Sequence, residues 1–254
     1  MKLTTRIKEY VDSARLTYFP LLASLSLTSE NSLRVTLNRL VKSGEIYNPI
    51  KGAYVSKNAD MFWVACQLYP GYISLSTAFY LHHLIEEFPF TVFVASNVRK
   101  SVQMGNMEFI YFKARNYDGI EKGDYPLASP EKAISDSLMH LSLTNFATLA
   151  KVLYYADIDS GKLIRLCDAE SSASFQRLGY LLSLLPKLDK EKSKTLSFCR
   201  QKIKANAYLS GKRSGTYIPE WKIIDNIGKE VILSWWQQQL SKSMNCVITQ
   251  QETD

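Results

Sequence analysis

The sequence lacks the features that mark secreted and membrane-spanning proteins. Its 254 residues contain no apolar run of about 18 residues, the length that suits a helix crossing a bilayer. Residues 1–10 are amphipathic and lack the apolar centre of a secretion signal. We therefore expect a cytoplasmic protein that does not enter a membrane.

Cysteine and histidine are scarce, and neither is spaced to hold a metal. No two of the four cysteines form a C-x-x-C pair, and none of the three histidines stands at ligand spacing from a cysteine. His82 and His83 are adjacent, so on a helix they point about 100° apart and make poor joint ligands. The sequence therefore predicts no metal and no cofactor, with packing roles for Cys66, Cys167 and His82.

Motifs for nucleotide or nuclease chemistry are missing as well. There is no Gly-rich phosphate loop. No strand supplies the converging carboxylates of a metal nuclease, and no Gly-Ser turn precedes the paired aspartates of a nucleotidyltransferase. Glu131, Lys132 and Asp136 come nearest, and we interpret Glu131 as a helix-capping residue and Asp136 as part of a surface ion pair. The sequence predicts no catalytic residues and a protein that is not an enzyme.

The charge is unevenly distributed. The net charge is +7, and residues 1–57 hold nine Lys or Arg against four Asp or Glu. Residues 58–142 are mildly acidic, with six Lys or Arg against nine Asp or Glu. Residues 143–254 are basic again, with sixteen Lys or Arg against eleven Asp or Glu. Two basic regions predict two surfaces that can face a polyanion, although charge alone does not separate DNA from RNA or an acidic protein.

The clearest pattern lies between residues 29 and 55. Ser29 is a good helix N-cap, and Gly44 is a good left-handed stop. Between them, one side of a helix is marked by apolar residues at helical spacing, namely Leu33, Leu37, Leu40 and Val41. Residues 46–55 then predict a two-stranded hairpin whose tip carries Lys51.

The opposite side of this helix is polar and basic. It carries Asn31, Val35, Asn38 and Lys42, flanked by Ser32 and Arg39, with Arg34 at one edge. Asparagine can bond adenine, valine can touch a thymine methyl, and Arg or Lys can reach guanine or phosphate. We therefore predict base contacts from Asn31, Ser32, Val35 and Asn38, and phosphate or guanine contacts from Arg34, Arg39, Lys42 and Lys51.

The predicted fold class is α+β. Helices over 4–14 and 18–24 precede the 29–43 helix, which therefore stands third, as the recognition helix of a winged helix-turn-helix does. We expect a DNA-binding domain over 1–57, a small α+β module over 58–142 and a mainly helical region over 143–254 that could join that module in one domain. The further predicted elements are helices near 60–69, 74–84, 130–141, 146–155, 160–167, 172–185, 191–205 and 227–241, and strands over 90–95, 107–113 and 126–129.

A second basic candidate lies in the C-terminal region. Residues 209–224 contain two glycines and a proline around Lys212 and Arg213, a composition typical of a loop, and a short apolar strand or extended segment is expected after it. These two cations could touch another stretch of DNA backbone or a partner, and a solvated loop is the simpler interpretation.

In this order the segments resemble the AbiEi antitoxins of type IV toxin–antitoxin systems and related winged-helix regulators. No single segment is specific for this family, but the order of the segments along most of the chain is specific for it. The segments are the helix and hairpin at 33–55, Gly-Tyr-Ile-Ser through His-His-Leu at 71–84, Ala-Ser-Pro-Glu-Lys-Ala-Ile-Ser-Asp at 128–136, and 175–182 followed by 212–226 around Trp221. The chain departs from the family at His83, where Gly is usual, and in its less basic hairpin.

The resemblance implies a repressor that binds operator repeats in double-stranded DNA upstream of its own operon. It also implies an antitoxin that opposes a nucleotidyltransferase-like toxin without forming a stable complex with it. Two alternatives stay open: a nuclease-like enzyme that uses the winged helix only to dock, and a protein-interaction adaptor. The sequence leaves the oligomeric state open.

Overall fold

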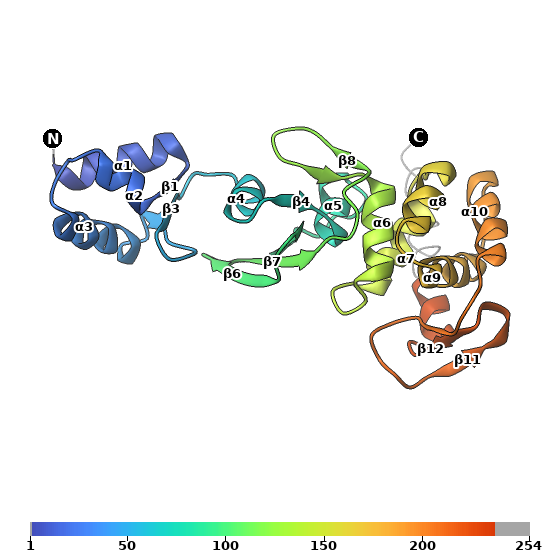
Figure 1. The fold of residues 1–254 in the computed structure, drawn as a ribbon. Helices are drawn as coiled ribbons and strands as arrows, with labels where there is room; N and C mark the ends of the chain where they lie inside the picture. The colour runs from blue at the N-terminus through green and yellow to red at the C-terminus, as the bar shows by residue number, and fades with distance from the viewer. Residues whose placement is uncertain (1, 237–254) are drawn as a thin grey trace, which may run out of the picture. The chain divides into compact units, whose positions relative to one another are not determined.

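A computed structural model of the chain describes residues 2–236 and shows a mixed α+β fold (Figure 1). This confirms the predicted fold class, including the N-terminal winged helix-turn-helix. The last predicted helix, 227–241, is helical over 229–236, and its residues 237–241, the tail from Ser243 and Cys246 lie outside the described residues. Within the described residues, no helix combines the length and apolarity needed to span a membrane.

The chain forms two compact units. The first comprises Met1–Ile73, Phe90–Lys113 and Lys122–Pro126, and the second comprises Ser74–Pro89, Ala114–Glu121 and Leu127–Asp254. The boundaries predicted from sequence at residues 57 and 142 stay predictions.

The first unit begins with the winged helix-turn-helix. Its β1 pairs antiparallel with β3, and β3 pairs antiparallel with β2, which gives the order β1-β3-β2. The elements are α1 (Leu3–Ala14), β1 (Leu16–Tyr18), α2 (Phe19–Ser24), α3 (Glu30–Lys42), β2 (Ile46–Tyr47) and β3 (Ala53–Ser56). Sequence analysis found the three helices and the hairpin but missed β1, since a three-residue strand has no periodicity of its own.

Apolar residues at helical spacing explain this packing. Ile7 and Val11 of α1 are fully buried against Leu33 and Leu37 of α3, with Tyr54 of β3 closing the same cluster. Successive strand residues point to opposite faces, so the neighbours of Tyr54 in β3, Ala53 and Val55, join a different cluster. That strand is therefore buried on both sides.

The rest of the first unit is a sheet with one helix. Strands β5 and β7 run parallel, β6 and β4 flank them antiparallel, and the order within this unit is β6-β7-β5-β4. The bounds are α4 (Met61–Leu68), β4 (Gly71–Ile73), β5 (Thr91–Ser96), β6 (Lys100–Met104) and β7 (Met107–Lys113). Val94, Phe109 and Ala65 pack together in the cluster that also takes up Ala53 and Val55.

The second unit is mostly helical. Its elements are α5 (Leu75–Leu81), β8 (Ile120–Glu121), β9 (Leu127–Ala128), α6 (Pro130–Met139), α7 (Phe146–Tyr155), α8 (Ser160–Asp168), α9 (Ser172–Ser183), α10 (Lys190–Gln201), β10 (Ala207–Tyr208), β11 (Thr216–Ile218), the 3-10 turn η1 (Pro219–Trp221) and β12 (Ile223–Asp225). The expected loop and the short strand after it belong to a three-stranded sheet of order β10-β12-β11, of which β10 and β11 were not predicted. A Cβ at Gly179 of α9 would lie 2.1 Å from a ring carbon of Trp221, so this glycine makes room for the indole.

Helix α6 corrects one interpretation from the sequence. Asp136 was expected in a surface ion pair, but its exposed fraction is 2% and that of Lys132 is 0%. The Nζ of Lys132 lies 2.8 Å from Asp136 Oδ1 and 3.4 Å from Glu170 Oε1. Ser74 occupies the N-cap position of α5 without capping it through its side chain, and its hydroxyl donates to Asp136 Oδ2 at 2.7 Å. Charged groups are satisfied here inside the protein, because α6 is covered on all sides.

Candidate nucleic-acid interface

All seven candidate residues on α3 are exposed, and so is Lys51 on the hairpin. The exposed fraction of Val35 is 49%, close to that of Leu21 at 51% and Val231 at 47%. About 100° separates successive residues of a helix, so the centre of the exposed face is formed by Asn31, Val35, Asn38 and Lys42. Arg34 lies at one edge of this strip, and Arg39 and Ser32 lie at the other.

Local contacts hold α3 in place and leave this strip uncovered. The Ser29 hydroxyl accepts a hydrogen bond from the Ser32 backbone N–H at 3.4 Å, which caps the helix as predicted. Thr36 is buried on the opposite side and donates its hydroxyl to the Ser32 carbonyl at 2.8 Å. Gly44 has φ +70°, as predicted for the residue that ends the helix and starts the hairpin.

Arg34 is directed away from the strip and toward the hairpin. Its guanidinium carbon lies 3.9 Å from the centre of the Phe19 ring, and one of its nitrogens lies 3.5 Å from a Glu30 carboxylate oxygen. Both Arg34 and Glu30 are exposed, so this ion pair adds little stability. The contacts do fix the direction of the guanidinium, which suits phosphate binding beside the hairpin better than base reading.

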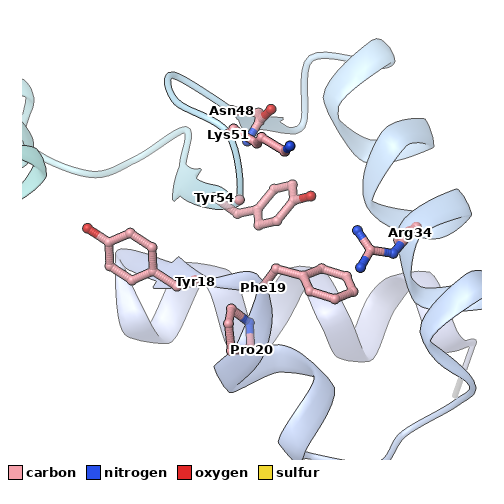
Figure 2. Close-up of a pocket in the computed structure, with 8 residues that line it drawn as sticks. Tyr18, Phe19, Pro20, Arg34, Asn48, Lys51 and Tyr54 are labelled. Carbon is pink, nitrogen blue, oxygen red and sulfur yellow. The ribbon is translucent and has the colours of Figure 1, made fainter.

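A pocket of about 850 Å³ lies between α3, the start of α2 and the hairpin (Figure 2). Figure 2 shows the Arg34 guanidinium over the Phe19 ring, with the Tyr54 hydroxyl and the Lys51 ammonium on the hairpin side. The lining residues are Tyr18, Phe19, Pro20, Arg34, Asn48, Lys51, Gly52 and Tyr54. Aromatic walls with two cations at the rim form a site for an anionic group carried on an apolar body, such as a sugar phosphate.

Burial raises the pKa of Tyr54, while the positive charge of Arg34 acts in the opposite direction. The phenol therefore stays protonated near neutral pH and can donate a hydrogen bond to an anion in the pocket. Sequence analysis did not select Tyr54, Phe19 or Tyr18 as site residues. The only signal was an aromatic residue just before Pro20 and another in the hairpin, which is equally typical of a core.

The hairpin tip is held rigidly. The Asn48 side-chain amide donates to the carbonyl oxygens of Ile50 at 3.0 Å and Ala53 at 2.6 Å. The Phe19 N–H donates to the Gly52 carbonyl at 2.7 Å, and Gly52 has φ +80°, a conformation that favours glycine. Lys51 is thus presented at the end of a fixed turn.

Three of the predicted cations are not neutralised. Within residues 2–236, Arg39, Lys42 and Lys51 take part in no ion pair, whereas Lys8 pairs with Glu45 at 3.2 Å. Arg39 lines a hollow with Lys8 and Glu45 on the α1 side of the helix. Positive charge therefore flanks the polar strip on both sides.

The structure places Lys212 and Arg213 in the second unit, on the exposed loop before β11. The Asn226 side-chain amide holds this loop by donating to the carbonyl oxygens of Ser210 and Lys212. Lys212 and Arg213 thus belong to a different unit from the α3 strip.

Other candidates have structural roles. Cys66 and Cys167 are buried, and His82 Nε2 lies 2.8 Å from the Ala128 carbonyl oxygen, as expected for packing residues. In the described part of the chain, no cluster of three or more His, Cys, Asp or Glu is arranged to hold a metal. Comparison with known proteins finds no family model that matches the chain and no significant match to a curated protein.

Proposed function

We propose that this protein is a sequence-specific DNA-binding transcriptional regulator acting in the cytoplasm. The observation that carries the proposal is the uncovered strip of Asn31, Val35, Asn38 and Lys42 on a capped third helix, next to a rigid hairpin with Lys51 at its tip. A helix of this kind fits the major groove of duplex DNA. An ordinary surface helix needs neither an exposed valine nor a flanking basic turn.

The roles divide according to position on the helix. Asn31, Ser32, Val35 and Asn38 read base edges, with asparagine bonding adenine and valine packing against a thymine methyl. Arg39 and Lys42 hold phosphate or guanine at the far edge of the strip. Arg34 and Lys51 hold one backbone phosphate at the pocket, whose sugar rests on Phe19 and Tyr18.

We further propose, on the resemblance to AbiEi, that the protein represses its own operon and acts as an antitoxin, without being an enzyme. One observation supports the resemblance: His83 has φ +57°, a conformation that favours glycine, and glycine is usual at this place in that family. The departure at His83 is therefore a strained substitution at a position where the chain needs a left-handed turn. The opposed toxin would be nucleotidyltransferase-like and would not form a stable complex with this chain.

The test is binding to duplex DNA from immediately upstream of its own gene, compared with random duplex of equal length. Asn38→Ala is expected to lose about 1–3 kcal/mol of discrimination at one base pair while keeping its random-DNA affinity. Lys42→Ala is expected to weaken binding to both duplexes and to lower the salt slope by about one unit. Fluorescence anisotropy at several salt concentrations measures both effects.

Lys122→Ala is the matched control for Lys42→Ala, because Lys122 is exposed in the same unit and belongs to neither α3 nor the hairpin. An equal loss on operator and random DNA for Asn38→Ala would rule out its reading role. Salt-independent binding, or no duplex binding at all, would favour the adaptor function instead.

A further inference from the structure

The small sheet of the second unit presents two unlike faces. Its register aligns Ala207 with Ile223 and Ile223 with Ile218, and residues that are paired across strands share a face. Ala207 and Ile223 are buried, so this row faces the interior. The row on the other face consists of Tyr208, Ile224 and Tyr217.

The outer row is aromatic and open to solvent. The exposed fractions are 39% for Tyr208 and 46% for Tyr217, with Ile224 partly buried between them. Strands lie about 4.8 Å apart, so the two tyrosines, separated by one strand, lie about 10 Å apart. A single planar group cannot cover both rings, whereas two groups carried on one flexible chain can.

The sheet is a fixed platform. Arg177 donates through Nε to the Tyr208 carbonyl at 2.8 Å, and the Gln176 amide donates to the Trp221 carbonyl at 3.0 Å. The β11 strand lies so close to β12 that a Cβ at Gly215 would sit 2.3 Å from the Asp225 carbonyl oxygen. The backbone that carries Tyr208 and Tyr217 is therefore held by contacts within the second unit.

Positive charge lies on the segments that lead into this sheet, Lys204 before β10 and Lys212 and Arg213 before β11. Lys204, Lys212 and Arg213 are exposed, and none of them pairs with an acidic residue in the described part of the chain. The two nearby acids are neutralised or hidden: Glu220 pairs with Arg200 at 2.8 Å, and Asp225 is buried and accepts the Tyr180 hydroxyl at 2.7 Å. The platform therefore favours an anionic partner.

We propose that the Tyr208–Ile224–Tyr217 face binds single-stranded nucleic acid. Two unstacked bases rest on the tyrosine rings, and Lys204, Lys212 and Arg213 hold the backbone phosphates. Alternating stacking surfaces and cations form the usual site for a single strand, whereas bases in a duplex have no free faces to offer. This inference is independent of the α3 strip and holds whether or not that strip reads DNA.

The test uses the full chain carrying Lys42→Ala and Lys51→Ala, which weaken any contribution from the winged helix. A labelled thymine-rich single strand of about ten nucleotides is titrated by fluorescence anisotropy, with a duplex of equal length as comparison. Tyr208→Ala and Tyr217→Ala are each expected to weaken single-strand binding about 5- to 150-fold, the effect of losing one stacked base. The Phe variants keep the ring and are expected to bind as the parent does.

Tyr155→Ala is the matched control, since Tyr155 of α7 is 49% exposed and lies outside the platform. Thermal melting of each variant separates lost binding from lost folding, and the Phe variants report stacking even where an Ala variant is destabilised. Unchanged single-strand affinity in both Ala variants would overturn the proposal. Preference for duplex would also overturn it, as would binding of an acidic polypeptide such as polyglutamate with no binding of the single strand.

Discussion

Helices α3 and α6 have similar N-terminal caps, but α3 faces solvent along one side and α6 is buried. Each is capped by a serine whose hydroxyl accepts from the backbone N–H three residues on, and each carries a glutamate in its first turn. In α3 the side chains of Asn31, Arg34, Asn38 and Lys42 face solvent, whereas in α6 every residue from Glu131 to Leu138 is buried. The charged side chains of α6 form ion pairs within the protein, while most of those of α3 remain available to a binding partner.

The difference shows that a charged helix is not necessarily a surface helix. Helix α3 packs through one side only, because the hairpin and α1 cover the apolar residues and nothing described covers the rest. Around α6, Ser74, Glu170 and Lys162 each supply a partner for a charged group from a different segment. A binding surface is therefore recognised by charged side chains that have no partner within the fold. Three predictions test the contrast between α3 and α6.

The largest effect is expected from Lys132→Ala in α6. The change leaves the carboxylates of Asp136 and Glu170 buried without their cation, which costs about 3–5 kcal/mol of unfolding free energy. Urea denaturation followed by circular dichroism measures it. The matched change in α3, Lys42→Ala, is expected to alter stability by no more than about 0.5 kcal/mol. Similar values for the two variants would remove the contrast between the helices.

Glu131→Gln is expected to have a smaller effect that depends on pH. Burial alone would raise the pKa of Glu131, but hydrogen bonds from Lys162 and from backbone N–H groups outweigh it and lower the pKa below 4.5. The ionised carboxylate therefore stabilises the fold above its unfolded pKa, and this stabilisation is lost as the pH falls through the lowered folded value.

At neutral pH the Glu131→Gln variant should be less stable by about 1.5–3 kcal/mol, the contribution of a hydrogen bond to a charged group. Denaturation curves for both proteins from neutral to acidic pH are expected to converge at the acidic end. A difference that stays constant across that range would contradict the role of the ionised carboxylate.

The smallest effects are expected at the two caps. Ser29→Ala removes an exposed cap with a 3.4 Å bond and should cost about 0.5–1 kcal/mol. Ser129→Ala removes a fully buried hydroxyl that also donates to Glu131 at 3.0 Å, and should cost up to about 2 kcal/mol. Thermal melting compares the two variants, and the reverse order would mean that burial does not set the strength of these caps.

Much of the fold could be predicted from local patterns. Helical spacing and caps located α1, α3, α4 and α6 to α10, because apolar residues recur in them at about 3.6-residue spacing, even in α6 and α9, which are buried on all sides. Strands β1, β4, β6, β8, β10 and β11 were missed, and all of these except β6 have only two or three residues. A strand of two or three residues has no pattern of its own and exists only through its partner, as when Leu16–Tyr18 pairs with Ala53–Val55.

The candidate strip was predictable for the same reason as the helix. Once the apolar side of α3 is known, geometry places Asn31, Val35, Asn38 and Lys42 together on the other side. The pocket beneath Arg34 was not predictable, since α2, α3 and the hairpin that carries Lys51 and Tyr54 meet there. The Tyr208–Ile224–Tyr217 face was not predictable from the sequence either, because it depends on the register of β10, β11 and β12.

The sequence by itself determined the third helix, its cap, its polar strip and the hairpin after it, because these depend on residues close together in the chain. The tertiary structure alone decided which charges stay free. Lys132 and Lys42 are the same residue type in similar helices, but Asp136 and Glu170 neutralise the first, and no described residue pairs with the second. Burial depends on what packs around a side chain, and residues distant in sequence supply that packing.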